Sequence, residues 1–156
     1  MAESIAQNAV KQISNHMALL YYYLTKEMIS DFGDDAKKTI EKAIIKFGHE
    51  RGRNIAEKVK AAGEELTIEN LDKYYDIPIV AGWSPNRIYE KGCKYNTTES
   101  CTFADVWMEK DWAEVGHIYC MVDIAIREGY SEHVIYTPGK NILKGDDCCT
   151  SVTTYE

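Results

Sequence analysis

Four of the five cysteines of this 156-residue chain lie between residues 101 and 149, together with an aspartate and large aromatic side chains. A cysteine thiolate is a strong nucleophile, and a nearby carboxylate can move protons during hydrolysis. Cys101, Cys120 and Asp123 are therefore the candidate catalytic residues. If this protein performs chemistry, we expect it in this stretch.

Cys101 precedes a helix that we expect to begin at Thr102, a suitable N-cap residue. The dipole and the free amides at a helix N-terminus lower the pKa of a nearby thiol and favour the thiolate. The sequence thus predicts Cys101 as the first candidate nucleophile and Cys120 as the second. The alternative for each cysteine is an inert role as a small hydrophobic residue.

Asp123 lies on a helix that the apolar spacing predicts over residues 111–128. Gly116, Cys120 and Asp123 follow one another along one line beside the apolar stripe, and Tyr119 is an i, i+4 neighbour of Asp123. A carboxylate at the border of an apolar surface is partly desolvated, which raises its pKa and suits it to proton transfer. Gly116 would leave room for a small substrate or a facing strand. The alternative is that Asp123 only caps or pairs with a loop.

Zinc binding is another use for the thiols, in a site assembled from Cys101, Cys120 and Cys149. The sequence contains no C-x-x-C pair, and the adjacent Cys148 and Cys149 do not fit the usual two-knuckle arrangement. An odd number of cysteines also prevents a complete set of disulfides within one chain. We therefore expect reduced thiols and no required cofactor, with zinc as the open alternative.

Glu50 and Arg53 are candidate substrate-binding residues in a second helix, expected over residues 36–62. The run Phe47-Gly-His-Glu-Arg-Gly-Arg53 interrupts its apolar pattern with two glycines, each of which costs about 1 kcal/mol against alanine in a helix. Close approach of a neighbouring element or a ligand would explain these glycines. Glu50 would then face inward, and the arginine would suit a carboxylate; the alternative is a surface ion pair.

The remaining elements follow from apolar spacing and turn residues. We expect helices at 4–30 and 67–75, strands at 77–83 and 87–95 joined by a turn at 84–86, a polar loop at 94–100, and strands at 132–137 and 147–155. This order predicts an α+β fold, in which N-terminal helices pack on a small antiparallel sheet of about four strands with two further helices. We expect a single domain, with residues 1–31 as an N-terminal helix and 32–156 as the core.

Composition and net charge exclude some classes of binding partner. The net charge of −7 argues against a nucleic-acid partner, which would require a basic face. The longest apolar run, residues 17–24, is too short to cross a bilayer, and the N-terminus lacks the pattern of a secretory signal. We therefore expect a cytoplasmic protein that acts on a small molecule. The tyrosines at 21–23 and the amphipathic first helix are compatible with a homodimer.

From about Ala36 to the C-terminus, these segments together resemble the L-2-amino-thiazoline-4-carboxylic acid hydrolase-like family. The resemblance is carried by Phe47-Gly-x-Glu-Arg-Gly-Arg53, Cys101-x-Phe-Ala-x-x-Trp107, Gly116-x-x-Tyr-Cys-x-x-Asp123, Gly129-Tyr130 and Gly145-Asp-Asp-Cys-Cys149. Thr102 departs from the family pattern, which usually has proline there. The resemblance implies hydrolytic opening of a cyclic amidine, a 2-aminothiazoline carboxylate, toward a carbamoyl-cysteine. Trp107, Tyr119 and Cys149 lie in these motifs and join Glu50 and Arg53 as candidate substrate-binding residues.

The C-terminal Gly-Asp-x-x-Cys pattern is also similar to that of the vinyl-reductase-type small-molecule-binding domains. Some of those domains hold zinc through cysteines. This second resemblance implies a non-catalytic module that binds a small molecule or zinc. The sequence thus supports two hypotheses, a cysteine/aspartate hydrolase and a binding module.

Overall fold

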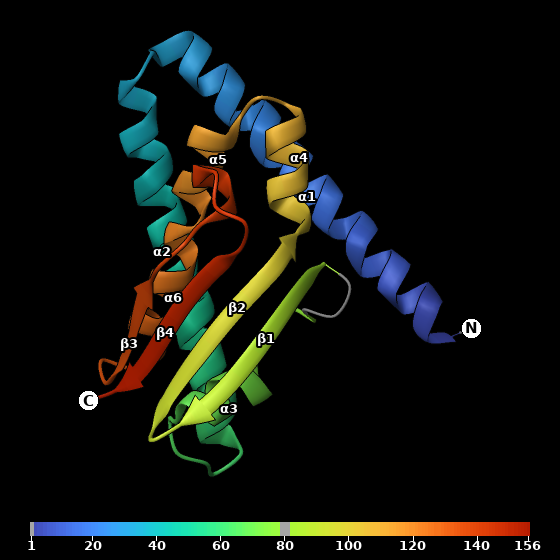
Figure 1. Ribbon diagram of the computed structural model, residues 1–156. Helices are drawn as coiled ribbons and strands as arrows, with labels where there is room; N and C mark the ends of the chain where they lie inside the picture. Colours follow the sequence, from blue (N-terminus) through green and yellow to red (C-terminus); the bar gives the residue numbers. More distant parts are fainter. Residues whose placement is uncertain (1, 79–81) are drawn as a thin grey trace.

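The computed structural model describes residues 2–78 and 82–156 (Figure 1). The first three helices are α1 (Ala2–Phe32), α2 (Asp35–Ala61) and α3 (Ile68–Lys73). They are followed by β1 (Trp83–Glu90), β2 (Cys93–Cys101), α4 (Thr102–Glu109), α5 (Ala113–Tyr119), α6 (Met121–Tyr130), β3 (Val134–Pro138), the short 3-10 helix η1 (Ile142–Lys144) and β4 (Cys149–Tyr155). The four strands form one antiparallel sheet in the order β1-β2-β4-β3, which confirms the predicted α+β class.

The two long helices diverge in a V, and α2 runs behind the sheet beside α6 (Figure 1). Gly33, with a φ of +66°, lies in the turn that separates α1 from α2, as the sequence indicated. None of the helices that the structure describes combines the length and the apolar character needed to cross a membrane.

Glycines allow α2 and α6 to approach closely. A Cβ on Gly52 would lie 2.2 Å from the carbonyl oxygen of Ile126, and one on Gly48 would lie 2.5 Å from the Cβ of Ala125. Gly129 of α6 faces the backbone of α2 in the same way. The predicted cause of the interrupted apolar pattern, close approach of a neighbouring element, is therefore confirmed.

The β1–β2 hairpin differs from the predicted strand pair. Lys91 and Gly92, with φ values of 51° and 75°, make the turn, while residues 84–86, which we expected to form it, lie within β1. The expected loop at 94–100 is part of β2. The strand expected at 77–83 includes residues 79–81, which lie outside the described residues.

The reason for this difference is the polar inner face of the sheet. On β2, Lys94, Asn96 and Thr98 line a cavity, so the strand lacks the alternation of apolar and polar residues from which strands are recognised. Asn96 pairs with Ser151 on β4, which lines the same cavity. The space between sheet and helices, usually a hydrophobic core, is here partly a polar chamber.

The helix expected over 111–128 is divided into α5 and α6. Cys120 stands at the joint, where its N–H donates to the carbonyl of His117 rather than continuing a regular α-helix. A Cβ on Gly116 of α5 would lie 2.6 Å from the indole ring of Trp107. The room beside Gly116 is therefore filled by Trp107, and not by a substrate or a strand.

Two apolar clusters stabilise the helices. The larger one lies between α2, α3 and α6 and includes Ile55, Leu71 and Ile126. The smaller one joins α1 to α4, where the indole N–H of Trp107 donates to the carbonyl of Ala18 over 3.0 Å. Trp107 is thus a buried structural residue as well as a part of the cavity wall.

Replacing Gly52 with alanine tests the contact between α2 and α6. Helix propensity alone would favour alanine by about 1 kcal/mol, but the added methyl meets backbone atoms of α6 that cannot move aside. We expect a net destabilisation of about 1–3 kcal/mol, measured by urea unfolding. Asn54→Ala, at an exposed position of the same helix, is the control and should be neutral or slightly stabilising. Equal stabilities of the two variants would contradict the close packing.

Candidate functional site

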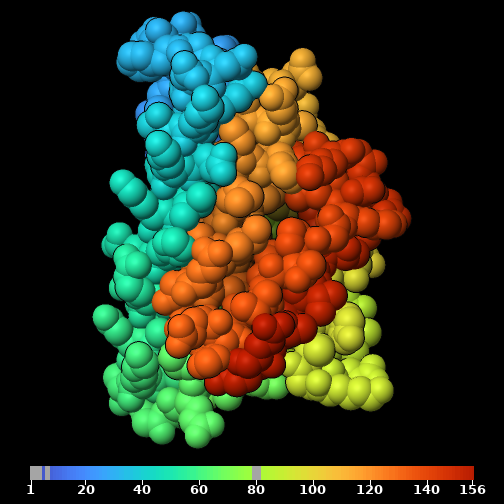
Figure 2. Space-filling view, turned by 90° about the vertical axis from the view of Figure 1, so that its left-hand side faces the viewer, coloured from blue at the N-terminus to red at the C-terminus, as the bar shows by residue number. Residues whose placement is uncertain are grey.

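A cavity of about 460 Å³ lies between the inner face of the sheet and helices α2, α4, α5 and α6. Figure 2 shows a hollow between the orange surface of α5 and α6 and the red surface of the segment that follows β3. His117, Lys140 and Lys144 are among the lining residues from these parts of the chain. Of the candidate site residues, six line the cavity: Cys101, Trp107, Tyr119, Cys120, Asp123 and Cys149.

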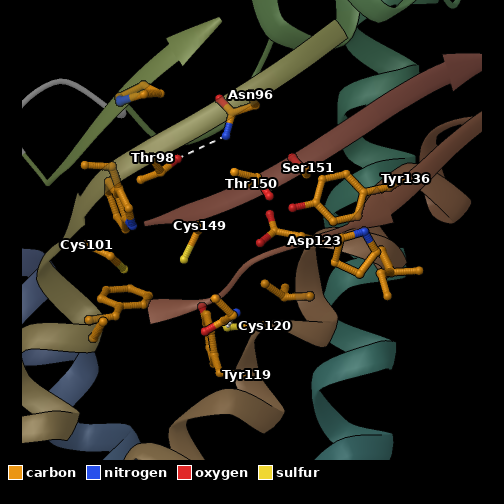
Figure 3. A pocket seen from close by; sticks show the side chains of 18 of the residues that line it. Asn96, Thr98, Cys101, Tyr119, Cys120, Asp123, Tyr136, Cys149, Thr150 and Ser151 are labelled. Carbon is orange, nitrogen blue, oxygen red and sulfur yellow. Dashed lines mark hydrogen bonds between the residues drawn. The ribbon is translucent and has the colours of Figure 1, made fainter. Parts of the chain in front are cut away.

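The three thiols come from different elements and point into one space (Figure 3). Cys101 is the N-cap residue of α4, Cys120 lies at the joint between α5 and α6, and Cys149 begins β4. The backbone N–H of Ile142 donates to the sulfur of Cys149 over 3.3 Å, and the side-chain amide of Asn141 donates to the sulfur of Cys120 over 3.6 Å. The segment around η1 thus holds two of the three thiols.

Burial keeps these thiols in the neutral form. It raises the pKa of Cys120 to about 12, although the hydrogen bond from Asn141 acts in the opposite direction. Burial also raises the pKa of Cys101 and that of Cys149. The backbone amides of Phe103 and Ala104 favour the Cys101 thiolate but do not offset burial. The helix N-terminus thus acts on Cys101 in the predicted direction, but burial acts more strongly and the pKa of this thiol is raised.

Asp123 faces the cavity one helical turn before Arg127. Its carboxylate accepts a hydrogen bond from Nη1 of Arg127 over 3.1 Å, and its side chain is 40% exposed. The guanidinium of Arg127 lies over the ring of Tyr136, 4.6 Å from the ring centroid. The carboxylate of Asp123 is therefore ion-paired and partly exposed, and it is not packed at the border of an apolar surface.

A second charged group lies farther along the cavity, at the end near α3. The side chain of Lys94 is only 3% exposed, and its ammonium donates to both carboxylate oxygens of Asp72, over 2.8 and 3.0 Å. Tyr89 also donates to Asp72, and Arg87 lies 3.9 Å from it. Burial would raise the pKa of Asp72, but Lys94, Tyr89 and Arg87 together hold it below its usual value.

Two of the candidate substrate-binding residues lie elsewhere. Glu50 and Arg53 are exposed on α2 and do not line the cavity, because the glycine face of α2 turns toward α6. Arg51 lines the cavity instead and forms a two-point ion pair with Asp76, at 2.8 and 2.6 Å. The sequence motif indicated Arg53, whereas Arg51, two residues earlier on the same helix, is the arginine of this motif that lines the cavity.

Sequence analysis also missed Lys94 and Arg127. Lys94 was placed in a loop, and only the correct strand register brings it opposite Thr153 on the inner face. Arg127 could have been found, because it lies four residues after Asp123 on the same helix, the spacing of a helical ion pair.

The thiols do not fit a zinc site. Across residues 2–78 and 82–156, no three His, Cys, Asp or Glu side chains are arranged to hold a metal ion. A structural zinc site needs four ligands in tetrahedral geometry. Cys101, Cys120 and Cys149 therefore line one cavity without forming the metal centre that the sequence left open.

Comparison with known proteins identifies the family. The family model described as L-2-amino-thiazoline-4-carboxylic acid hydrolase matches residues 12–152. The chain belongs to this family, as the resemblance predicted, and this membership fits a hydrolase. Among curated protein sequences, none matches the chain.

A solved structure shares the fold. It is a trafficking protein particle complex subunit 3 from Naegleria fowleri, covalently bound to palmitic acid. The TM-score is 0.57 at 17% sequence identity, and the match covers 94% of this chain and 96% of that chain. At this identity the likeness concerns the fold alone.

Thiol alkylation tests the electrostatics of the cavity. Because burial raises their pKa, Cys101, Cys120 and Cys149 should react with iodoacetamide much more slowly at pH 7.5 in the native protein than in the urea-unfolded one. The rate at Cys120 should rise about tenfold per pH unit through pH 8–10, since the thiolate fraction does so below the pKa. Peptide mass spectrometry identifies each site. Rapid native alkylation of a cavity thiol at pH 7.5 would show that it is a thiolate.

Proposed function

We propose that this member of the family is a small hydrolase that opens the ring of a cyclic amidine carboxylate, the substrate class in the family's name. The observation that carries the proposal is the meeting of Asp123 with three thiols in one cavity. A carboxylate beside candidate nucleophiles is the usual arrangement for acid–base and covalent catalysis. The cavity also has cationic groups for the carboxylate of the substrate.

The chemistry of the substrate suggests the role of Asp123. In a 2-aminothiazoline, one ring carbon bonds to the sulfur and to two nitrogens, and the protonated amidine carries a positive charge. Asp123 is the acidic side chain nearest the thiols among the described lining residues, so it would pair with this cation. A product that carries the carbamoyl group on the amine of cysteine keeps both nitrogens on that carbon. Hydrolysis therefore breaks the C–S bond of the ring.

Cys120 is the proposed nucleophile, because it precedes Asp123 by three residues and the two side chains lie on one face of the cavity. An amidinium bound beside Cys120 would lower the pKa of its thiol, since an opposite charge favours the thiolate. The thiol of Cys120 gives its proton to Asp123 as its sulfur attacks the ring carbon, and Asp123 passes this proton to the ring sulfur, which leaves as a thiol. Asp123 then takes a proton from the attacking water and returns it to the sulfur of Cys120, which leaves as a thiol; the protonated carbamoyl group loses its remaining proton to solvent and gives the carbamoyl product.

A second candidate is a non-catalytic module that holds a small molecule in the same cavity. What favours it is that burial raises the pKa of all three thiols, so that they favour the neutral form. The subunit of similar fold carries covalently bound palmitic acid, and this supports a ligand-carrying role as the second candidate. In this case the thiols would contact or carry the ligand without turnover.

Turnover of L-2-amino-thiazoline-4-carboxylate by purified variants distinguishes the candidates. We expect Cys120→Ser to reduce kcat by at least about 10³-fold. Asp123→Asn should reduce it by about 10²–10⁴-fold, because it removes the acid–base group. Cys101→Ser and Cys149→Ser should keep most of the activity. Cys93→Ser, outside the cavity, is the matched control and should behave as the wild type.

Two results would contradict the proposal. If Cys120→Ser keeps the wild-type rate, Cys120 is not the nucleophile; if Cys101→Ser and Cys149→Ser also keep it, a cavity thiol acting alone is excluded, and Asp123 with water is left as the catalytic group. If the wild type binds the ring compound in calorimetry but never releases a carbamoyl product, the binding module is correct. Mass spectrometry of the Cys120-containing peptide during turnover should show the covalent adduct.

A further inference from the structure

The cavity is larger than the ring compound in the family's name. A single five-membered ring with one carboxylate fills only a small part of 460 Å³, a volume within the usual range for much larger ligands. The walls also differ from one end to the other. These two observations indicate an elongated ligand with two chemically different ends.

One end of the cavity is aromatic. Trp83 packs edge-on against Phe103, with ring centroids 5.2 Å apart, and Phe103 lies 5.4 Å from Trp107 and 5.3 Å from Tyr119. All four side chains line the cavity, together with Leu143. They surround the end of β2 at which α4 begins, beside the thiols. Such a group of rings suits an apolar or aromatic part of a ligand.

The opposite end is cationic, although the protein carries a net charge of −7. Four basic residues line this end, Arg51, Arg87, Lys94 and Arg127, and they pair with three carboxylates, those of Asp72, Asp76 and Asp123. Burial lowers the pKa of Lys94, and the positive charges of Arg127 and Arg87 lower it further. Four basic groups against three carboxylates leave one positive charge in excess at this end, because Arg87 and Lys94 share Asp72, and this excess favours an anion.

Arg127 is the residue best placed to bind that anion. It is 7% exposed and lines the cavity, and its Nη1 donates to Asp123. Its Nε, however, has no hydrogen-bond partner within residues 2–78 and 82–156. A buried donor without a partner is rare in proteins and is commonly satisfied by a water or a ligand. The free edge of the guanidinium suits a carboxylate.

We propose that the ligand of this cavity is an elongated amphipathic carboxylate. Its carboxylate binds Arg127 near Lys94, and its apolar part extends between Trp83, Phe103 and Trp107. The inference rests on the proposed function only in placing the ligand in the same cavity. If the ligand is also the substrate, the reacting amidine lies between these two ends, beside Asp123 and the thiols.

Calorimetry with a series of ω-phenyl carboxylates, from phenylacetate to 5-phenylpentanoate, tests the proposal without requiring turnover. Affinity should rise about fourfold for each added methylene, as apolar surface enters the aromatic end. The corresponding primary amides, which have the same shape but no charge, should bind roughly 10- to 150-fold more weakly to the wild-type protein. This comparison needs no variant and so is not affected by a loss of folding.

Arg127→Gln identifies the anion-binding residue. It should weaken carboxylate binding by a similar factor but leave amide binding nearly unchanged, because only the carboxylate uses the guanidinium charge. Arg53→Gln removes the same charge from the exposed face of α2 and is the matched control, with no change expected. Circular dichroism and thermal unfolding confirm that each variant is folded.

The outcomes are separable from those of the hydrolase assay. Equal affinities for carboxylates and amides, or no gain with length, would overturn the proposal even if the ring compound is hydrolysed. An equal loss of both ligands in folded Arg127→Gln would exclude Arg127 as the anion site. Length-dependent, charge-dependent binding supports the proposal even if the protein hydrolyses no cyclic amidine.

Discussion

The close approach of α2 and α6 is the contact on which the rest of the structure depends. Gly48 and Gly52 bring the two backbones together, and the backbone of α6 lies where side chains at these positions would otherwise extend. The same helix α6 carries Asp123 and Arg127 toward the sheet. The glycine contact therefore sets how far these two charged groups stand from the inner face of the sheet. Because that face is polar, the apolar packing that stabilises the fold lies mainly between the helices.

Burial disfavours the charged form of the titratable groups in the cavity, and the partners of each group decide whether its pKa rises or falls. Asp72 keeps its charge because Lys94, Tyr89 and Arg87 surround it, so its pKa falls despite burial. The thiol of Cys120 has only a weak amide donor, and burial raises its pKa to about 12. A buried charge is stable only where an opposite charge or strong donors replace water. The cavity therefore has fixed charges at one end and neutral thiols at the other.

The sequence predicted the elements that depend on local residue spacing, and it did not predict the strand register and the buried charges that depend on the cavity. Helical periodicity predicted the long helices, and the order of elements predicted the α+β sheet. The clustering of Cys101, Cys120 and Asp123 was also visible, because these residues lie close together in the chain. The register of β2 could not be predicted, because a strand that lines a polar cavity lacks the alternation of apolar and polar residues. Lys94, on that strand, was missed for the same reason. The position of Cys101 at a helix N-terminus did not predict its raised pKa, because tertiary packing buries the thiol.

The charges near the centre of the cavity alternate in sign, and this order connects the two ends. Asp123 accepts from Nη1 of Arg127 and remains 40% exposed, while Nε of Arg127 has no partner among residues 2–78 and 82–156. A ligand with an amidinium beside Asp123 and a carboxylate beside Arg127 would extend the pair to four charges of alternating sign. Each charge would then have a partner of opposite sign, and the internal ion pair would not have to break. A ligand of this kind is stabilised at both charges, whereas a cation alone would leave the positive end of the cavity without an anion.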